Sequence, residues 1–257
     1  MTSPFRLDNK TVLITGAGGG IGRAMVQAFR DAGATTIGVD REASMLEGLD
    51  LAHAILHDQA DPKDTRTAIE KHLMQHGAPD AVVSNAGWTR AEVLDQLDDD
   101  SWASELAINL SGAYALTDPL INAMAARGQG SLVFIASVNA LAHYGNPAYS
   151  AAKAGLVAYS KAIAVERGGQ GVRSNVICPG SVRTPAWDHR LEADPTLLDN
   201  VLPHYPLGRM VSPIEVANAA LFFCSDAASG ITGTVLPVDA GLTAGNLRFV
   251  DDVLRAK

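Results

Sequence analysis

The sequence predicts an α/β fold built on a doubly wound parallel sheet of about seven strands, with helices on both faces. Short runs of aliphatic and β-branched residues alternate with longer segments of helical periodicity, which is the pattern of a parallel sheet with helical crossovers. Glycine, proline and helix-capping residues separate many of these segments. The 257 residues contain no linker, repeat or low-complexity segment, so we expect residues 1–257 to form a single domain.

The first half of the chain is predicted to hold four strands and three helices. The β-rich run at 11–15 leads into a segment of helical spacing that stops at Gly33, a natural helix end. Asp61 before Pro62 is a helix start, because a capping side chain precedes proline at the first helical position. The strands are expected at 11–15, 34–39, 53–57 and 80–84, and the helices at 21–32, 62–76 and 98–127.

The second half continues the alternation. The apolar run before Ser137 reads as a buried strand, and Pro147 with the alanines after it favours a helix. Ser212 and Glu215 form a capping box around a proline at the first helical position. The strands are expected at 131–136, 171–178 and 234–238, and the helices at 147–167 and 213–226.

Two segments do not fit the alternation. Residues 184–211 carry four prolines, mixed charge and weak periodicity, and are too long for an ordinary connection, so we expect a substrate-binding loop. The tail at 245–257 extends past the last strand. We expect its apolar residues to pack on a neighbouring subunit and close that subunit's pocket: Leu247, Phe249, Val250, Val253 and Leu254.

The composition excludes several classes of partner. Twenty basic against 28 acidic residues give a net charge of −8, which disfavours non-specific binding to nucleic acid or anionic lipid. We find no run of 18 apolar residues and no signal-peptide layout in residues 1–10. Cys178 and Cys224 lie in apolar contexts and are expected to be buried thiols, so a cytoplasmic location is expected.

A glycine cluster between the first strand and the first helix predicts a phosphate site. Its spacing is Gly16-x-x-x-Gly20-x-Gly22, with Gly18 inside, and not the G-x-G-x-x-G pattern. Glycines let the backbone turn tightly and approach a pyrophosphate, which rests on the amino end of the helix. A glycine-rich turn without a ligand is the alternative.

Asp40, at the end of the second strand, bears on the choice of nucleotide. A carboxylate there accepts hydrogen bonds from both ribose hydroxyls and repels a 2′-phosphate, which favours NAD over NADP. The guanidinium of the adjacent Arg41 is able to accommodate that phosphate, so NADP stays open as the less favoured cofactor.

Tyr149 and Lys153 are the candidate catalytic pair. Residues four apart lie on the same face of a helix, and an ammonium beside a phenol favours the phenolate over the neutral form. Ser137, at the end of a predicted strand, is placed to hold a substrate oxygen nearby. Such a cluster suits proton transfer at an alcohol or carbonyl, although Tyr-x-x-x-Lys alone also occurs by chance.

The motifs together resemble the short-chain dehydrogenase/reductase family, in its common-length NAD(P)-dependent branch, and sugar and polyol dehydrogenases in particular. The resemblance runs from about residue 7 to 245. It is carried by Thr15-Gly16-x-x-x-Gly20-Ile21-Gly22, Asn85-Ala86-Gly87, Asn109, Ser137, Tyr149-x-x-x-Lys153, Pro179-Gly180 and Thr184. Ser84 departs from it, since the family commonly has asparagine there.

The resemblance implies a Rossmann-type fold, a homotetramer and roles for individual residues. Tyr149 would be the general acid/base, Ser137 would orient the reacting oxygen, and Lys153 would hold the nicotinamide ribose and lower the pKa of the tyrosine. Asn109 would hold a water beside Lys153, and Asp58 would bond the adenine amino group. The expected cofactor-binding set is Gly16, Gly18, Gly20, Ile21, Gly22, Asp40, Arg41, Asp58, Gln59, Asn85, Ala86, Gly87, Tyr149, Lys153, Pro179, Gly180, Val182 and Thr184.

Three further patterns are set aside. His72 and His76 have the spacing of a metal site, but Leu73 stands where the zinc-protease motif needs glutamate, so no metal is expected. The acidic run at 98–100 is assigned to a helix amino end, where the helix dipole favours negative charge, and not to a cation site. The G-x-S-x-G motif of serine hydrolases does not occur in the sequence.

The substrate pocket is expected to be polar and partly cationic, which favours a sugar, sugar acid or polyol. The expected substrate residues are Arg90, Ser137, Asn139, His143, Tyr149 and Trp187. The predicted function is NAD-dependent hydride transfer between a secondary alcohol and nicotinamide, with Tyr149 as the general acid/base and the physiological direction left open. An NADPH-dependent 3-oxoacyl-thioester reductase is the enzyme alternative, and a non-catalytic nucleotide-sensing protein is a remote one.

Overall fold

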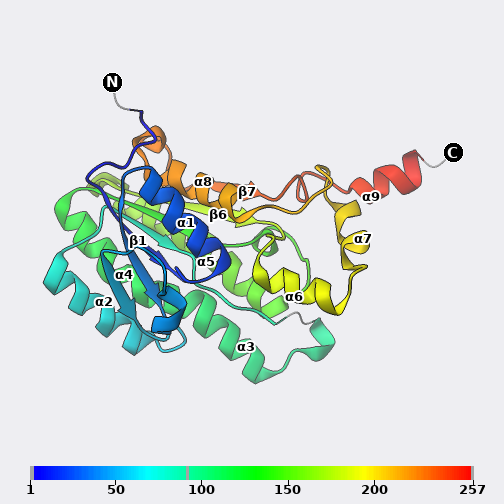
Figure 1. Cartoon of the computed structure of the whole chain (residues 1–257), viewed down its shortest axis with the longest axis horizontal. Helices are drawn as coiled ribbons and strands as arrows, with labels where there is room; N and C mark the ends of the chain where they lie inside the picture. Colours follow the sequence, from blue (N-terminus) through cyan, green and yellow to red (C-terminus); the bar gives the residue numbers. More distant parts are fainter. Residues whose placement is uncertain (1–2, 91–92, 256–257) are drawn as a thin grey trace.

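The computed structural model describes residues 3–90 and 93–255. Its centre is one seven-stranded sheet in the order β3-β2-β1-β4-β5-β6-β7, in which every neighbouring pair is parallel (Figure 1). This confirms the predicted fold class. The strands are β1 (Thr11–Thr15), β2 (Thr35–Asp40), β3 (His53–Leu56), β4 (Ala81–Ser84), β5 (Gly130–Ile135), β6 (Val172–Pro179) and β7 (Val235–Val238).

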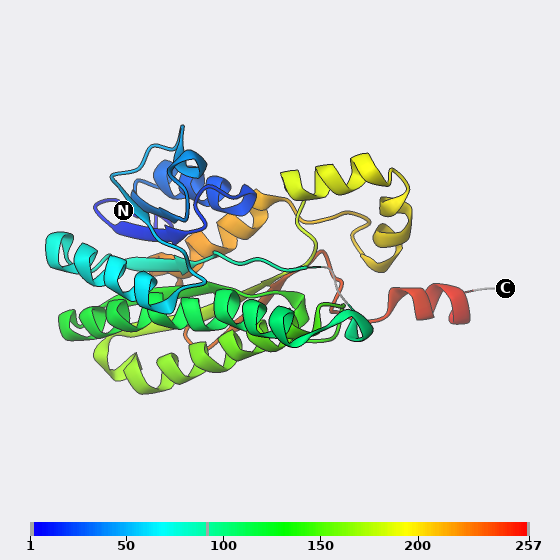
Figure 2. The ribbon, with the colours of Figure 1, turned by 90° about the horizontal axis from the view of Figure 1, so that it is seen from below.

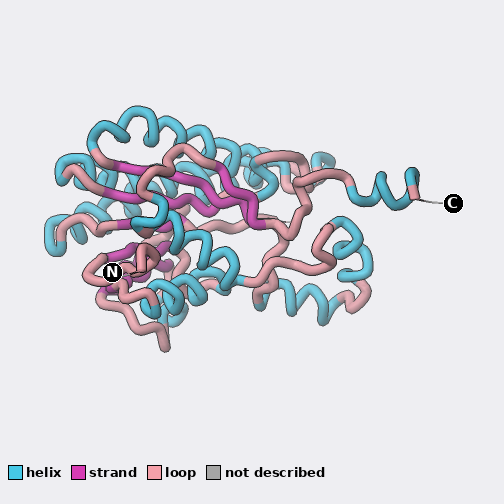
Figure 3. Tube along the Cα trace, turned by 90° about the horizontal axis from the view of Figure 1, so that it is seen from above, coloured by secondary structure: helices cyan, strands magenta, loops and turns pink. Residues whose placement is uncertain are grey.

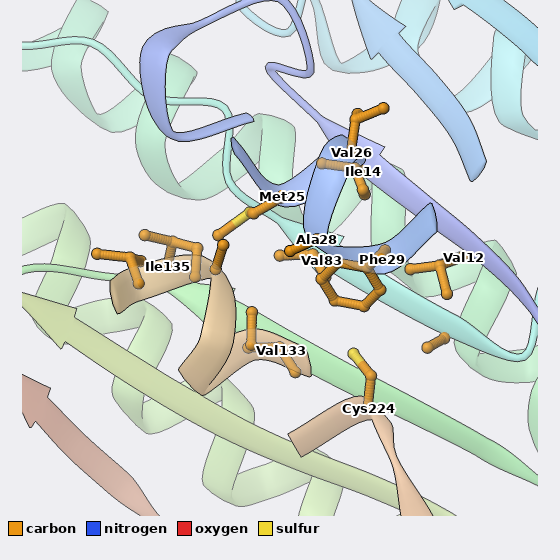
Figure 4. Close-up of a cluster of buried hydrophobic side chains, with 14 of the residues drawn as sticks. Val12, Ile14, Met25, Val26, Ala28, Phe29, Val83, Val133, Ile135 and Cys224 are labelled. Carbon is orange, nitrogen blue, oxygen red and sulfur yellow. The ribbon is translucent and has the colours of Figure 1, made fainter. Parts of the chain in front are cut away.

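Helices cover both faces of the sheet because successive strand residues point to opposite sides (Figure 2). Val12 and Ile14 of β1 pack towards α1 and α8, in the cluster drawn in Figure 4, whereas Leu13 packs towards α2, α4 and α5. Each face thereby builds its own buried layer. The main helices are α1 (Gly20–Asp31), α2 (Pro62–His76), α3 (Asp99–Leu106), α4 (Gly112–Arg127), α5 (Pro147–Arg167) and α8 (Pro213–Cys224).

The predicted caps begin the helices where the sequence places them. The Asp61 side chain accepts hydrogen bonds from the amides of Lys63 and Asp64, and Ser212 forms the capping box with Glu215. The Arg209 guanidinium and the Ser212 amide lower the pKa of Glu215 to about 2. Loss of such a cap typically costs about 1 kcal/mol of stability.

The long helix expected at 98–127 is interrupted. Asp98 is its N-cap, and a π-helical turn at Ala107–Ser111 separates α3 from α4. A π-turn shifts backbone hydrogen bonds by one residue and is frequently found at functional sites. Asn109 lies inside this turn, so the interruption falls on a predicted catalytic residue.

The segment at 184–211 is more ordered than predicted. It contains α6 (Pro185–Ala193) and α7 (Leu197–Val201). Neither helix has a buried residue, so neither needs the apolar periodicity by which a helix is recognised in a sequence. Figure 2 shows that both helices lie beside the carboxyl ends of the strands.

The C-terminal tail projects from the body of the molecule (Figure 3). It contains α9 (Leu247–Phe249) and a π-turn at Val250–Leu254, with Phe249, Val253 and Leu254 exposed. Its last two residues, 256–257, lie outside the described residues. None of the helices in residues 3–90 and 93–255 is long and apolar enough to cross a membrane.

Candidate active site

The glycine turn after β1 is joined to the loop after β4. The Thr15 hydroxyl accepts hydrogen bonds from the amides of Asn85 (2.9 Å) and Ala86 (2.8 Å), and the Asn85 side chain donates to the Thr15 carbonyl at 2.9 Å. Gly16 has a φ of +60°, and a Cβ there would lie 3.0 Å from the Cα of Ala86. The close approach of the two loops therefore requires glycine. This junction lies between β1 and β4, where the strand order reverses, which is the usual ligand crevice of such sheets.

The amino end of α1 is left open for an anion. Its N-cap, Gly19, makes no side-chain capping bond, and the first turn contains no acidic residue. Helix amides without an internal partner attract phosphate groups. A Cβ on Gly20 would lie 2.9 Å from the Thr184 side chain, so the residue before α6 packs against the amino end of α1.

Asp40 ends β2 beside the same turn. One carboxylate oxygen accepts from the amide of Gly18 at 3.0 Å, and the other accepts from the amide of Arg41 at 2.9 Å. The Arg41 guanidinium, largely exposed, pairs with Glu42 at 3.1 Å. The carboxylate is thus held at the cavity wall, and the neighbouring arginine has a carboxylate partner of its own.

These elements enclose a cavity of about 800 Å³, within the range of small-molecule and cofactor sites. Twelve of the predicted cofactor residues line it: Gly16, Gly18, Gly20, Ile21, Asp40, Arg41, Asp58, Gln59, Asn85, Ala86, Gly87 and Thr184. The residues present therefore fit a dinucleotide. The lining residues absent from the expected set are Thr15, Gly19, Val39, Met45, His57, Trp88, Ser104, Ile108, Pro185 and Ala186.

Six predicted cofactor residues lie outside the cavity lining: Gly22, Tyr149, Lys153, Pro179, Gly180 and Val182. Gly22 does not line the cavity but is needed for the glycine turn, because a Cβ there would lie 2.0 Å from the Gly16 carbonyl oxygen. Gln59 lines the cavity, but its side chain mainly connects the neighbouring backbone segments. Its buried amide donates to the Ile108 carbonyl at 2.8 Å and the Ala86 carbonyl at 3.3 Å. The Asp58 carboxylate is exposed and accepts from the Ala60 amide.

Ser137, Tyr149 and Lys153 meet at the carboxyl end of β5. The Ser137 side chain lies close enough to the Tyr149 phenol to lower its pKa. The Lys153 ammonium lies 5.4 Å from the centre of the tyrosine ring and donates to the Ile135 carbonyl at 2.9 Å. The three predicted catalytic groups are therefore brought together.

The protonation of this pair differs from the expectation. Burial raises the pKa of Tyr149 to about 12, only partly offset by the Ser137 hydrogen bond, and burial lowers the pKa of Lys153 to about 8. Lys153 is not among the groups that lower the tyrosine pKa. Desolvation of the phenol is the largest influence on the pKa of Tyr149.

Asn109 is fixed by several hydrogen bonds. Its side-chain amide donates to the Trp88 carbonyl at 2.7 Å, and to both the backbone and the side chain of Glu105 at 3.0 Å. Its oxygen accepts from the Trp88 amide at 3.2 Å. Glu105 is a buried carboxylate that the sequence analysis missed, although it stands one helical turn before Asn109.

The predicted substrate residues fall into two groups. Asn139 supports Ser137: its oxygen accepts from the serine hydroxyl at 3.2 Å, and its amide donates to the Gly145 carbonyl at 2.8 Å. The exposed residues are His143 and Arg90, with Trp187 partly exposed. The Arg90 guanidinium lies 5.5 Å from the ring of Trp88, and that of Arg190 lies 4.3 Å from the ring of Trp187.

His72 and His76 lie with His53 in a stack of imidazoles, with ring centres 4.0 Å apart for His53 and His76 and 4.9 Å apart for His72 and His76. In the parts of the chain that the structure describes, no group of three or more His, Cys, Asp or Glu residues has an arrangement able to hold a metal ion.

A dinucleotide-sized cavity beside a Ser–Tyr–Lys cluster defines an NAD(P)-dependent oxidoreductase. A family model described as enoyl-(acyl carrier protein) reductase matches residues 16–243. An uncharacterised oxidoreductase of Schizosaccharomyces pombe is 40% identical over 96% of both chains. D-threitol dehydrogenase of Mycolicibacterium smegmatis is 38% identical, over 93% of this chain and 95% of its own. A 3-oxoacyl-[acyl-carrier-protein] reductase of Thermotoga maritima is 34% identical, over 93% of this chain and 99% of its own.

Solved structures agree with these relatives. A short-chain dehydrogenase/reductase from Burkholderia thailandensis superposes with a TM-score of 0.89 at 40% identity, covering 96% of this chain and 98% of that one. A gluconate 5-dehydrogenase from Burkholderia cenocepacia, in complex with NADP and tartrate, gives 0.86 at 30% identity, covering 94% and 98%. The chain belongs to the short-chain dehydrogenase/reductase family and is an enzyme acting on CH–OH donors.

Proposed function

We propose that this protein is an NAD-dependent dehydrogenase that oxidises a secondary alcohol of a polyol, sugar or sugar acid. The observation that carries the proposal is the meeting of Ser137, Tyr149 and Lys153 at the end of β5, next to the nucleotide cavity. When bound, the nicotinamide cofactor accepts the hydride from the alcohol carbon.

The chain's own residues handle the proton and the oxygen. Ser137, held by Asn139, hydrogen-bonds the substrate oxygen and keeps it against the phenol of Tyr149. The Tyr149 phenolate takes the hydroxyl proton as the carbon–oxygen double bond forms. Lys153 supplies positive charge to this end of the site, and a water held by Asn109 would link its ammonium group to solvent, so that the proton taken up by Tyr149 leaves the site. The same groups return the proton when a ketone is reduced.

NAD is the preferred cofactor in this proposal because Asp40 lies at the cavity wall with both oxygens oriented by backbone amides. A 2′-phosphate placed there would meet this carboxylate, and like charges at close range are unfavourable. The pairing of Arg41 with Glu42 supports the same preference, since it reduces the positive charge offered to a phosphate.

A polyhydroxylated substrate is favoured by two observations. The proposed substrate residues Arg90 and His143 are exposed and Trp187 is partly exposed, so each would be open to the hydroxyl or carboxylate groups of such a substrate. Among its relatives, the D-threitol dehydrogenase acts on a polyol. The alternative, an NADPH-dependent 3-oxoacyl-thioester reductase, is favoured by the Thermotoga maritima relative and by Arg41.

We further propose a homotetramer in which α4 and α5 pack between subunits and the tail at 245–257 contacts a neighbouring pocket. The exposed apolar residues Phe249, Val253 and Leu254 support this arrangement, since they contribute no core of their own.

The function is tested by following NADH and NADPH formation with D-threitol, galactitol, gluconate and simple secondary alcohols, beside reduction of an acetoacetyl thioester. The proposal expects NADH from a polyol, sugar or sugar acid. Thioester reduction with NADPH alone would establish the alternative. Activity restricted to apolar alcohols would overturn the substrate class while leaving the reaction class intact.

A further inference from the structure

Glu105 is a buried acid at the edge of the catalytic cluster. Its side chain is only 3% exposed, on α3, one turn before the π-helical turn that contains Asn109. Burying a carboxylate is costly unless hydrogen bonds and nearby cations compensate it. Its contacts therefore indicate what it does in this site.

Both carboxylate oxygens face groups of the site. One accepts from the Arg90 amide at 2.9 Å, and the other accepts from the Asn109 side-chain amide at 3.0 Å. An ionised carboxylate only accepts, so it selects the NH₂ end of the Asn109 carboxamide. The oxygen of Asn109 must then point the other way, where it accepts from the Trp88 amide.

That orientation carries the contact network to Lys153. A Cβ on Gly87 would lie 2.8 Å from the Asn109 oxygen and 3.1 Å from the Lys153 nitrogen, so both atoms pack against this one glycine. The Asn109 carboxamide thus stands between an anion and a cation. Among the residues that the structure describes, the titratable and charged groups linked to Glu105 and Lys153 are Tyr149 on α5, Cys178 on β6, and Arg90, whose backbone amide binds Glu105 and whose guanidinium acts on Asp98.

We propose that Glu105 is a positioning residue of the active site, whose carboxylate fixes the Asn109 carboxamide next to the Lys153 ammonium. Burial lowers the pKa of Lys153, and Cys178 and then Glu105 oppose that lowering; burial raises the pKa of Tyr149, and Glu105 adds to the rise. Glu105 therefore contributes to the pH range in which the pair works. Only the expected effect of Glu105 on turnover rests on the proposed function.

The direct test is a pH titration of Lys153 by NMR on the full chain without substrate. The sequence has only six lysines, so the ¹³Cε signals of ¹³C-lysine-labelled protein are few, and Lys153→Met assigns the one of interest. Glu105→Gln keeps the size of the side chain and removes its charge. We expect the Lys153 titration to move to lower pH in this variant. The matched control is Asp100→Asn, which removes one charge from an exposed position of the same helix and leaves the titration in place.

A second variant separates charge from position. Glu105→Asp keeps the charge but shortens the side chain, so the Lys153 titration should stay near the wild-type pH while turnover falls. In Glu105→Gln the acidic limb of alcohol oxidation should move to lower pH, because the Tyr149 pKa falls with the lost anion. An unshifted Lys153 titration in Glu105→Gln, an equal shift in Asp100→Asn, or a Glu105→Gln chain that does not fold would each overturn the proposal. If none of the tested alcohols reacts, the NMR titration still decides it, so its failure is distinct from failure of the proposed function.

Discussion

Arg23 and Asp40 hold the two backbone groups of a single residue, Gly18. The Asp40 carboxylate accepts from the Gly18 amide at 3.0 Å, and the Arg23 guanidinium donates to the Gly18 carbonyl at 2.9 Å. Arg23 also donates to the Met45 carbonyl at 2.6 Å, which fixes the segment after β2 over the glycine turn. A Cβ on Gly18 would lie 2.3 Å from that same carbonyl, so the two segments are in close contact. This end of the cavity is therefore ordered by contacts within the chain itself.

Arg23→Met tests this arrangement. In this variant the Gly18 and Met45 carbonyls lose a charged hydrogen-bond donor, so the glycine turn is less well ordered in the free enzyme. Part of the free energy of cofactor binding is then used to order the turn, and the affinity for the cofactor falls. We expect KM for the nucleotide to rise roughly tenfold with a much smaller change in kcat, because hydrogen bonds to charged groups are worth about 1.5–3 kcal/mol and Arg23 is partly solvated. Gln27→Met, one turn further along α1, is the control and should bind cofactor as the wild type does. Equal effects in both variants would contradict the assignment.

Asp40→Ser tests the selection of NAD. Removing the carboxylate takes away both the acceptor for the ribose and the repulsion of a 2′-phosphate. The ratio of kcat/KM for NAD to that for NADP should fall roughly a hundredfold, since like charges in contact cost several kcal/mol. Steady-state kinetics with both cofactors measure this ratio. A wild-type enzyme that already prefers NADP, or a ratio unchanged in the variant, would count against the role of Asp40.

Stability should decline on acidification through the buried histidines. Burial lowers the pKa of His72, with repulsion from His76 and His53 adding to it, and burial lowers the pKa of His57. A depressed folded-state pKa gives stability that is present above the unfolded value of 6.5 and is lost as the pH falls below it. Urea unfolding at pH 7.5 and pH 5.5 should show this loss. His72→Leu should reduce the difference, whereas the exposed His189→Ala should not.

Deletion of residues 246–257 tests the proposed role of the tail. The described part of this segment has no buried residue, so the fold should survive with nearly the same thermal midpoint. Assembly should weaken and KM for the alcohol should rise, because the tail contacts a neighbouring subunit in the proposed tetramer. Sedimentation and kinetics of the truncated chain check both effects. Unchanged assembly and an unchanged KM would rule the role out.

The sequence predicts what depends on local rules and misses what depends on packing. Helix starts at Asp61 and Ser212 follow from capping chemistry, and the Gly16 turn follows from its position after a strand. The π-turn around Asn109 has no local signal in the sequence, and the Asn109 side chain that it carries makes its contacts with Trp88 and Glu105 only in the folded chain.

Some residues of the candidate site can likewise be predicted from the sequence, and others only from the folded structure. Residues at strand ends, such as Asp40 and Asn85, are found by position alone. Met45 reaches the cavity from the turn after β2 and Ser104 from α3, and neither follows a strand end directly, so only the tertiary fold shows that they line the cavity. Glu105 was within reach of sequence reasoning, since a charged residue one turn before Asn109 shares its helix face. The high pKa of Tyr149 was not, because it results from burial in the folded chain.

The most direct test of the account is turnover by Tyr149→Phe with a substrate that the wild type oxidises. Removing the hydroxyl leaves the ring and the cavity in place but eliminates the proton acceptor, so kcat should fall by about 10²–10⁴, the usual contribution of general acid–base catalysis. Nucleotide binding, followed by fluorescence, should be unchanged. Tyr159→Phe, which removes a hydroxyl from the same helix α5 away from the catalytic cluster, should keep its turnover. Wild-type turnover in Tyr149→Phe would show that this phenol does not transfer the proton.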